Sequence, residues 1–353
     1  MVKDNELHQA IEKVIFQMFK ISTIYETECE KGTPYMDRWE WPQGVALFGL
    51  YLYYKETGDK KYFDMIVKYF EDHIKKGLPQ KNVNTMCPML TMTYIYEETG
   101  DEKYLTLCKE WLEYVMNEMP RTVEGGIQHI TTADVNYQQL WDDTLYMTVL
   151  FVARMGVILK DDKYIQESVH QFLVHLKYLT DTKTGLFFHG WTFEGNHNFA
   201  NALWARGNSW YTAGLVDYLD MIDVEEGVRT HLVETLKRQV EALAELQCES
   251  GLWNTLLDDK NSYEEASATA AFGYGILKAV RCGYLDKKYE EIGIRAVKGV
   301  MKCIDEQGIV NQVSYGTGMG MTLDDYRKIP ICPQLYGQSM TMLLLVESLK
   351  HNI

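Results

Sequence analysis

The sequence predicts an all-α fold in which two concentric layers of helices form a closed ring. A short phrase that opens helices recurs along the chain, nearly all-apolar helical stretches alternate with amphipathic ones, and aromatic-rich connections follow alternate helices. No stretch alternates polar and apolar residues for more than a few positions, which argues against a sheet. The chain has 353 residues, 46% of them hydrophobic, so it can bury a large core.

The phrase Asp-x-Lys-Tyr marks the start of each predicted outer helix. Its four copies begin at Asp59, Asp101, Asp161 and Asp286. The first two copies follow Thr-Gly, so a glycine is expected to end one helix while Asp caps the next. A helix that is apolar on most faces precedes the phrase, as over residues 43–55 and 88–98. The long gap before the last copy predicts a diverged copy near Asp223, ahead of a helix over residues 228–246.

Five or six such helix pairs favour a closed toroid over an open solenoid. The aromatic connections, such as residues 185–191 and 251–254, would gather at one mouth of a ring but would spread along one face of a solenoid. No Pro-, Gly- or Ser-rich linker interrupts the pattern, so residues 1–353 are expected to form a single domain. A non-catalytic α-helical binding scaffold remains the alternative from periodicity alone.

Composition excludes several classes of function. The formal net charge of −15 argues against nucleic acid or an anionic membrane as partner, and it means that local positive groups must capture any anionic substrate. No apolar stretch reaches the roughly 18 residues of a membrane span, and the N-terminus begins a charged amphipathic pattern, so a cytoplasmic protein is expected.

The cysteines are expected to be reduced and without a metal or other cofactor. They are odd in number and no two have a paired metal-ligand spacing. They stand at Cys29, Cys87, Cys108, Cys248, Cys282, Cys303 and Cys332. We interpret them as small hydrophobic residues of the core.

Two adjacent carboxylates, Asp142 and Asp143, stand at the start of a run that is too apolar for an exposed helix. Ionised Asp is rarely buried without a partner or a task. Both residues would share a helix face with apolar neighbours, so helical geometry alone does not choose between them. Either could also simply cap the helix N-terminus.

Bulky rings concentrate in the predicted connections and helix starts. Seven of the eight tryptophans lie there, which suggests a platform for sugar rings, because tryptophan faces stack on apolar C–H surfaces. The same segments contain Trp41, His129, Trp141, His189, Trp204, Arg206, Trp210 and Tyr336. For any single tryptophan, filling a gap between a loop and the barrel is an equally good interpretation.

Eight ordered motifs resemble glycoside hydrolase family 105, the unsaturated rhamnogalacturonyl and related unsaturated glucuronyl hydrolases. They occupy residues 84–90, 126–129, 141–147, 185–191, 204–210, 251–253, 267–270 and 336–338, and the resemblance runs from about residue 35 to 347. It implies an (α/α)6 barrel, in agreement with the repeat. It also implies release of a terminal 4,5-unsaturated uronic acid from lyase-generated oligosaccharides, most simply an unsaturated rhamnogalacturonan disaccharide in pectin degradation.

The implied reaction is hydration of an enol ether. An acid protonates carbon-4 of the double bond, water adds at carbon-5, and the hemiketal opens and expels the sugar partner. One carboxyl group can serve both steps as general acid and then general base. By motif position this group is Asp143, whose burial in an apolar helix would raise its pKa.

The resemblance also implies the substrate contacts. His189 and Arg206 would bind the uronate carboxylate or ring hydroxyls, since Arg offers a fork that matches a carboxylate. The stacking candidates are Trp41, Trp204 and Trp210, and the further sugar contacts are Asn84, His129, Trp141, Asp142 and Tyr336. Some relatives, especially in family 88, have a second important Asp near Asn84, and many have His where this chain has Asn254. An amide cannot exchange protons, so a mechanism with two carboxylates is in doubt.

Other enzymes on helical toroids explain the motifs less well. A zinc enzyme of the lanthionine-cyclase or prenyltransferase kind would need clustered Cys, His or Asp ligands. An epimerase would need paired bases, for which His129 and His189 are available, but it leaves the Trp-Asp-Asp-Thr segment unexplained. The small anionic oligosaccharide partner follows from the resemblance. Its exact linkage, and whether the protein is a monomer or a homodimer, stay open.

Overall fold

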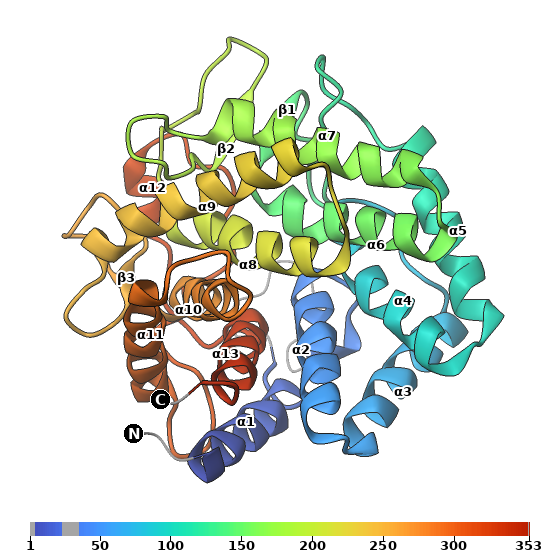
Figure 1. The fold of residues 1–353 in the computed structure, drawn as a ribbon, viewed down its shortest axis with the longest axis horizontal. Helices are drawn as coiled ribbons and strands as arrows, with labels where there is room; N and C mark the ends of the chain where they lie inside the picture. The colour runs from blue at the N-terminus through green and yellow to red at the C-terminus, as the bar shows by residue number, and fades with distance from the viewer. Residues whose placement is uncertain (1–3, 23–34, 352) are drawn as a thin grey trace.

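Two concentric rings of helices make up residues 4–22, 35–351 and 353, the part of the chain that this computed structural model describes. The inner ring consists of α2 (Trp41–Thr57), α4 (Cys87–Thr99), α6 (Leu150–Leu159), α8 (Ala205–Met221), α10 (Ala266–Arg281) and α13 (Leu335–Ser348). Each inner helix packs against the next, and α13 packs against both α10 and α2, so the ring closes (Figure 1). This closure excludes the open solenoid.

The outer layer pairs one helix with each inner helix. It consists of α1 (Asp4–Met18), α3 (Lys60–Lys76), α5 (Glu102–Asn117), α7 (Asp162–Leu179), α9 (Glu226–Leu246) and α11 (Glu290–Cys303). Helix α1 packs against α13, and each of the others packs against the inner helix that precedes it. The prediction of an (α/α)6 barrel is therefore confirmed.

Burial explains the two layers. In α8 and α13 nearly every residue is buried, as expected for helices that are apolar all round and enclosed by neighbours. In α3 the buried residues, including Tyr62, Ile66, Tyr69 and Phe70, recur every three or four positions and form one stripe. One continuous cluster of buried apolar side chains runs from Leu7 to Ile353 and joins the layers.

The repeated phrase caps the outer helices as predicted. In all four copies the Asp side chain accepts a hydrogen bond from the backbone N–H two residues later; the copies begin at Asp59, Asp101, Asp161 and Asp286. The last copy opens a 3-10 turn, η3 (Lys287–Tyr289), which leads into α11. Gly58 and Gly100 end α2 and α4 with φ of 70° and 67°, the left-handed conformation that favours glycine.

The helix predicted after the diverged copy near Asp223 is present, but Asp223 does not cap it as the Asp of the other copies does. Helix α9 begins at Glu226, and its N-cap residue, Glu225, makes no side-chain capping bond. Asp223 instead pairs with Arg229, 3.1 Å away, through an exposed side chain.

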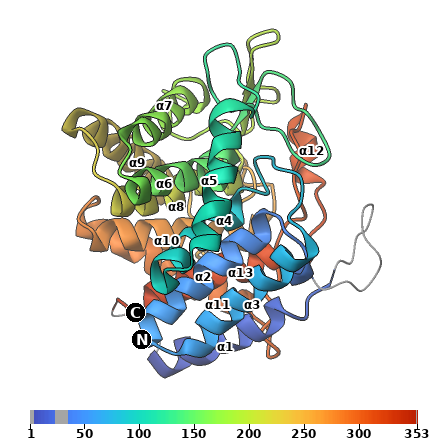
Figure 2. The same ribbon diagram turned by 90° about the vertical axis from the view of Figure 1, so that its right-hand side faces the viewer.

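Short elements occupy the connections. Strand β1 (Gln139–Trp141) pairs antiparallel with β2 (Gly190–Thr192), and β3 (Trp253–Asn254) pairs with β4 (Glu264–Glu265). A 3-10 turn, η1 (Tyr35–Asp37), precedes α2, and a π-helical turn, η2 (Leu145–Val149), precedes α6. The long connection between α11 and α13 contains α12 (Leu323–Arg327), which lies outside the two rings on the right of Figure 2.

Two further expectations can be compared with the described residues. No described helix is long and apolar enough to cross a membrane. The described cysteines are all free thiols, as expected: Cys87, Cys108, Cys248, Cys282, Cys303 and Cys332. Cys29 lies outside the described residues.

Candidate active site

A cavity of about 860 Å³ opens where several inner helices begin. Its wall includes the first residues of α2, Asn84 shortly before α4, Asp143 immediately before η2 and α6, and Arg206 at the start of α8. Between these helix starts the wall is completed by residues 129–141 and by 316–321, from the connection before α13. The gathering of connections at one mouth, predicted from the repeat, is thus observed for these segments. The two segments given as examples, 185–191 and 251–254, do not line the cavity themselves.

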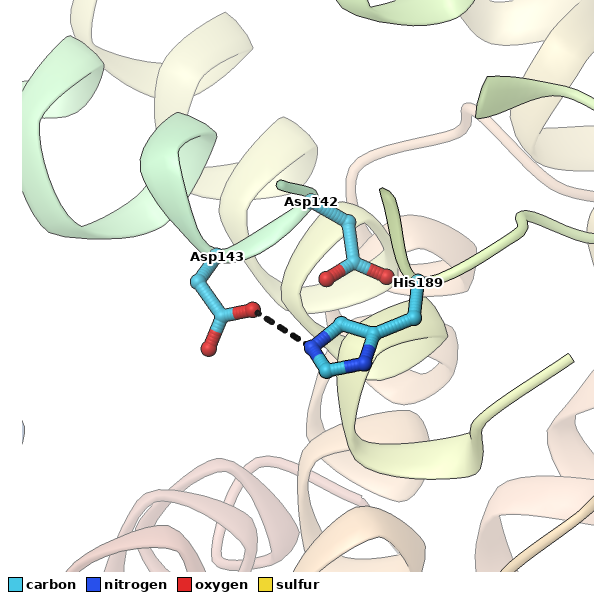
Figure 3. Close-up of side chains that lie close together, drawn as sticks. All are labelled: Asp142, Asp143 and His189. Atoms are coloured by element: carbon cyan, nitrogen blue, oxygen red, sulfur yellow. Dashed lines mark ion pairs between the residues drawn. The ribbon is translucent and has the colours of Figure 1, made fainter. Parts of the chain in front are cut away.

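Asp143 is the partly buried carboxyl group of this wall. Its Oδ1 accepts a hydrogen bond from Trp210 Nε1 at 3.1 Å. Its Oδ2 has no hydrogen-bond partner and lies 3.7 Å from His189 Nε2 (Figure 3). Burial raises the pKa of Asp143, while the adjoining side chain of Asp142 and the charge of Arg206 oppose that rise. The side chain keeps 17% of its surface exposed, so it can reach both solvent and a ligand.

Asp142 is completely buried behind Asp143, and neither of its carboxyl oxygens has a hydrogen-bond partner. Its carboxyl group packs directly on the backbone of Gly207 in α8, where any side chain would collide with it. Burial raises the pKa of Asp142 well above its ordinary value, and the neighbouring charge of Asp143 raises it further. Both carboxyl groups are therefore protonated more readily than an exposed Asp, and because they adjoin they share protons and titrate as a unit.

The backbone around the pair holds both carboxyl groups in place. Asp142 donates its N–H to the carbonyl of His189 at 3.2 Å, next to the β1–β2 ribbon. Leu145 donates back to the carbonyl of Asp142 at 3.3 Å and is the first residue of the π-helical turn η2. Such turns are rare and often mark functional sites.

His189 is buried beside the carboxyl pair and is neutral. Its Nδ1 lies 2.7 Å from the hydroxyl of Tyr326, and its ring packs 4.3 Å from the ring of Trp204. Burial lowers the pKa of His189 well below its ordinary value, and the neighbouring His129 and Arg206 act in the same direction. Figure 3 shows its imidazole close to both carboxyl groups.

His129 and Trp141 form a stacked pair on the cavity wall. Their ring centres are 4.3 Å apart and their planes differ by 5°. His129 Nδ1 lies 2.8 Å from Thr144 Oγ1, and burial lowers the pKa of His129 to about 3. His129 is thus a neutral hydrogen-bonding group, which makes it a poor proton donor at neutral pH.

Arg206 is the buried cation of the site. Its guanidinium lies between two aromatic rings, 4.7 Å from Trp204 and 4.8 Å from Tyr336. Both terminal nitrogens donate to the 314–317 segment, the shortest bond being 2.6 Å to Ser314 Oγ. Because these donors already have acceptors, Arg206 supplies positive charge to the cavity and holds the 314–317 segment, while a free fork for the substrate carboxylate is not available.

The remaining predicted aromatic residues pack together next to Asp143. Trp41 stacks on Tyr336 at 4.8 Å and meets Trp210 edge-on at 5.5 Å. Trp41 lines the cavity, whereas Trp210 is 1% exposed and its indole N–H is used by Asp143. Tyr336 is also buried and donates its hydroxyl to the carbonyl of Ser314 at 2.6 Å.

The structure brings all the predicted site residues into one region, but in two shells. Those that line the cavity are Trp41, Asn84, His129, Trp141, Asp143, Trp204 and Arg206. Those that lie behind its wall are Asp142, His189, Trp210 and Tyr336, whose predicted direct contact with sugar does not match this position. For these four a supporting role toward Asp143 and Arg206 fits the geometry. Asn254 lies in β3, away from the cavity.

The sequence reasoning missed several residues of the site. Arg38, Thr131, Phe199 and the segment 316–319 line the cavity, and Tyr326 contacts His189 from α12. The glycines of the segment Gly-Thr-Gly-Met-Gly at 316–320 were a possible signal, because glycine is common where backbone approaches a ligand closely.

Asp142, Asp143 and His189 present one atom each within 4.8 Å of one another, which is also a donor set for a metal ion. A proton can neutralise the buried carboxyl pair in place of a metal ion, because burial raises the pKa of Asp142 well above its ordinary value. The geometry alone therefore supports an acid that is positioned for proton transfer at the wall of a sugar-sized cavity.

Comparison with known proteins identifies the family. The profile of Glycosyl Hydrolase Family 88 matches residues 13–352. The unsaturated rhamnogalacturonyl hydrolase YesR of Bacillus subtilis is 31% identical over 342 residues, which cover 96% of this chain and 97% of that protein.

Two crystal structures described as possible members of family GH105 are nearly superimposable on the chain, both at 47% identity. The one from Klebsiella pneumoniae has a TM-score of 0.95 and covers 99% of this chain and 94% of that one. The one from Salmonella enterica serovar Paratyphi A has a TM-score of 0.96 and covers 99% and 95%. The chain therefore belongs to the glycoside hydrolases of the family 88 profile and, among them, to family 105.

Proposed function

We propose that this glycoside hydrolase releases the terminal 4,5-unsaturated uronic acid from lyase-generated oligosaccharides, with the unsaturated rhamnogalacturonan disaccharide as its preferred substrate. The activity in the name of YesR, which matches nearly the whole chain, supports the substrate class. The single observation that carries the reaction is Asp143, a mostly buried acid with raised pKa on the wall of an 860 Å³ cavity.

Asp143 performs both proton transfers in this proposal. Its carboxyl group protonates carbon-4 of the enol ether, positive charge develops at carbon-5, and the resulting carboxylate takes a proton from the water that adds there. The hemiketal then opens to a ketone and expels the sugar partner. Asp143 ends the cycle protonated again, so no second carboxylate has to exchange protons, in agreement with an amide at Asn84.

The local field at the cavity favours a substrate carboxylate although the protein is strongly acidic. Inner helices α2, α4, α6 and α8 all begin at or next to this wall, and helix N-termini carry partial positive charge. The guanidinium groups of Arg38 and Arg206 lie on the same wall. Together they supply the local positive groups that a net charge of −15 makes necessary.

The sugar contacts are assigned from the lining residues. Trp41, Trp141 and Trp204 present aromatic surface for the pyranose rings, and Asn84 and His129 present polar groups for hydroxyls. Trp210 and His189 hold Asp143 instead of the sugar, and Tyr336 supports Arg206.

The whole chain, residues 1–353, is proposed to act as a single catalytic domain, since one apolar core joins its first and last described helices. We propose a cytoplasmic enzyme that acts on small oligosaccharides as a monomer or homodimer. The non-catalytic scaffold is set aside, because the chain belongs to a family of hydrolases.

The proposal is tested by following the absorbance of the enol-ether band with a set of unsaturated disaccharides that differ in the sugar partner. Fastest decay with the rhamnose-linked substrate, together with release of rhamnose, is expected. Faster turnover of a glucuronyl disaccharide linked to another sugar would assign the alternative, an unsaturated glucuronyl hydrolase. No decay with any unsaturated uronyl substrate would refute the function.

A chelation experiment separates the shared proton from a metal ion at the carboxyl pair. Dialysis against EDTA is expected to leave turnover unchanged. Loss of activity that a divalent cation restores would show that Asp142, Asp143 and His189 bind metal.

A further inference from the structure

Tyr326 contacts the active site although it comes from α12, outside the two helical rings. Its hydroxyl lies 2.7 Å from His189 Nδ1, and its side chain is 1% exposed. The ring packs against the backbone of Gly320, where any side chain would collide with it. Tyr326 therefore occupies a position built for its ring, with the hydroxyl aimed at one atom of His189.

The hydrogen of the Tyr326 hydroxyl has one good acceptor. The backbone N–H of Gly320 donates to this oxygen at 3.2 Å, so that bond uses a lone pair and leaves the hydroxyl hydrogen available. The sulfur of Met319, at 3.8 Å, is a weak and distant acceptor, whereas His189 Nδ1 is near and well placed. Burial raises the pKa of Tyr326 well above its ordinary value, so the hydroxyl keeps its hydrogen throughout the working pH range.

The opposite nitrogen of His189 faces the proposed catalytic acid. His189 Nε2 has no hydrogen-bond partner and lies 3.7 Å from Asp143 Oδ2. A neutral imidazole carries one hydrogen, and a hydrogen bond at one nitrogen decides which nitrogen has it. If Nδ1 accepts from Tyr326, the hydrogen is on Nε2 and points at the Asp143 carboxylate.

We propose that Tyr326 is a positioning residue that holds His189 as the Nε2–H tautomer, so that His189 donates toward Asp143 when that group is a carboxylate. The inference rests on the proposed function of Asp143. The contact of 3.7 Å is long for a hydrogen bond, and such contacts tighten when substrate binds. The donor stabilises the carboxylate that remains after carbon-4 has been protonated, which lowers the cost of the first step.

The other charged and titratable groups that face His189 are compatible with this tautomer. They are Asp142 and Asp143 from the segment before α6, His129 before β1, Arg206 from α8 and Tyr326 from α12. The positive charge of Arg206 opposes a second proton on the imidazole. Asp142 holds its own proton by burial, so it does not compete as a carboxylate for Nε2–H.

The tautomer can be read directly by two-bond ¹H–¹⁵N spectra of protein labelled with ¹⁵N-histidine. The His189 signals are assigned by their loss in His189→Gln. The Nε2–H pattern is expected in the wild-type protein and a mixture with Nδ1–H in Tyr326→Phe. A wild-type Nδ1–H pattern, or no change in Tyr326→Phe, would overturn the proposal. Because this readout needs no turnover, it is independent of whether Asp143 proves to be the acid.

Kinetics provide the second readout. Tyr326→Phe is expected to lower kcat about 10-fold and to leave KM within about twofold, because one oriented donor is lost. Loss of the donor also raises the pKa of Asp143, so the alkaline limb of the kcat–pH profile should move up by about half a pH unit or more. A lower kcat with an unmoved limb would show a merely structural role and contradict the proposal.

Tyr211→Phe is the matched control. Tyr211 is fully buried and donates its hydroxyl to the carbonyl of Leu232 at 2.9 Å, between α8 and α9. Its substitution removes a buried hydroxyl without touching His189. In Tyr211→Phe the His189 spectrum and the kcat–pH profile should equal those of the wild type. If this variant shifted them as much as Tyr326→Phe does, the effect would come from the loss of any buried hydroxyl.

Discussion

Two buried carboxyl groups at opposite ends of α8, Asp217 and Asp142, differ in whether a cationic side chain pairs with them. Asp217, near the C-terminal end of α8, accepts hydrogen bonds from Tyr274 at 2.5 Å and from Lys278 at 2.8 Å. Asp142, which packs on Gly207 at the start of the same helix, has no hydrogen-bond partner. One end of α8 thus contacts a compensated ion pair and the other an uncompensated carboxyl pair.

The comparison distinguishes a buried charge that stabilises the fold from a buried acid that serves the reaction. Burial lowers the pKa of Lys278, but the carboxylates of Asp217 and Asp220 outweigh this effect and raise it above the ordinary value, so the amine is charged. Burial raises the pKa of Asp217 too, but Lys278 and Tyr274 oppose that rise. At the mouth no such cation touches Asp142, and burial raises its pKa well above the ordinary value. A cationic partner favours the ionised form of a buried acid. Without such a partner, burial favours the protonated form, which has a proton to transfer.

Asp143→Asn should have the largest effect, because it removes the transferable proton. We expect a loss of kcat of about 10³-fold, or about 4 kcal/mol, with little change in KM or in the melting temperature. The measurement is enol-ether absorbance decay together with thermal melting. Asp134→Asn, at an exposed acid on the rim of the same cavity, should stay within about twofold of wild type. Rates near wild type for Asp143→Asn would remove the distinction between the two carboxyl groups.

Lys278→Met should show the opposite pattern, a stability loss without a catalytic one. Removing one partner strands Asp217 as a buried charge, which costs about 3 kcal/mol, measured by urea unfolding. Adding Asp217→Asn should recover part of this loss. The kcat of the folded variant should equal that of the wild type. A kcat that falls in proportion to stability would show that the ion pair belongs to the active site.

Asp142→Asn should make the protein more stable, and increasingly so as pH rises. The folded pKa of Asp142 is raised above its unfolded value, so the folded state loses stability as pH rises from about 4 through the folded pKa. Asn mimics the protonated form and lacks this loss. The gain should be near zero at pH 4 and about 1–2 kcal/mol at pH 8, measured by chemical unfolding at both pH values. A gain independent of pH would mean that Asp142 is not the protonated member of the pair.

Trp210→Phe should have the smallest effect, because it removes the indole donor that holds Asp143 Oδ1 but keeps an aromatic ring. We expect kcat to fall about 10-fold, equivalent to the loss of one hydrogen bond to a charged group. Trp253→Phe is the control, since its indole also donates while fully buried, to the carbonyl of Leu243 at 2.8 Å. Equal kinetic losses in the two variants would assign the effect to packing.

The fold could be predicted because its signals are local. An Asp that caps its own helix and a Gly that ends the one before are readable within a few residues, as at Asp59 and Gly58. The same logic failed at Asp223, where the pattern Asp-x-Lys-Tyr is absent and the helix begins without a side-chain cap.

Most residues of the site could be predicted from the sequence, but the role of each residue could not. Motif positions pointed to Arg206 and Trp210, yet neither the acceptors of Arg206 on the 314–317 segment nor the bond from Trp210 to Asp143 is visible in the spacing of residues. Tyr326 was missed altogether. It stands 137 positions from its partner His189, in a short helix without a repeated pattern, and only the tertiary fold brings them together.

The π-helical turn η2 has a consequence for how the enzyme can vary. A turn of this kind holds one residue more than an α-helical turn, so Leu145–Val149 separates the carboxyl pair from α6 by a count of residues. Deleting one of the five would let this segment close as a regular α-helical turn, which would change how the carboxyl pair is held against Gly207. We therefore expect the length of this turn to matter for catalysis in its own right, apart from the identity of its residues.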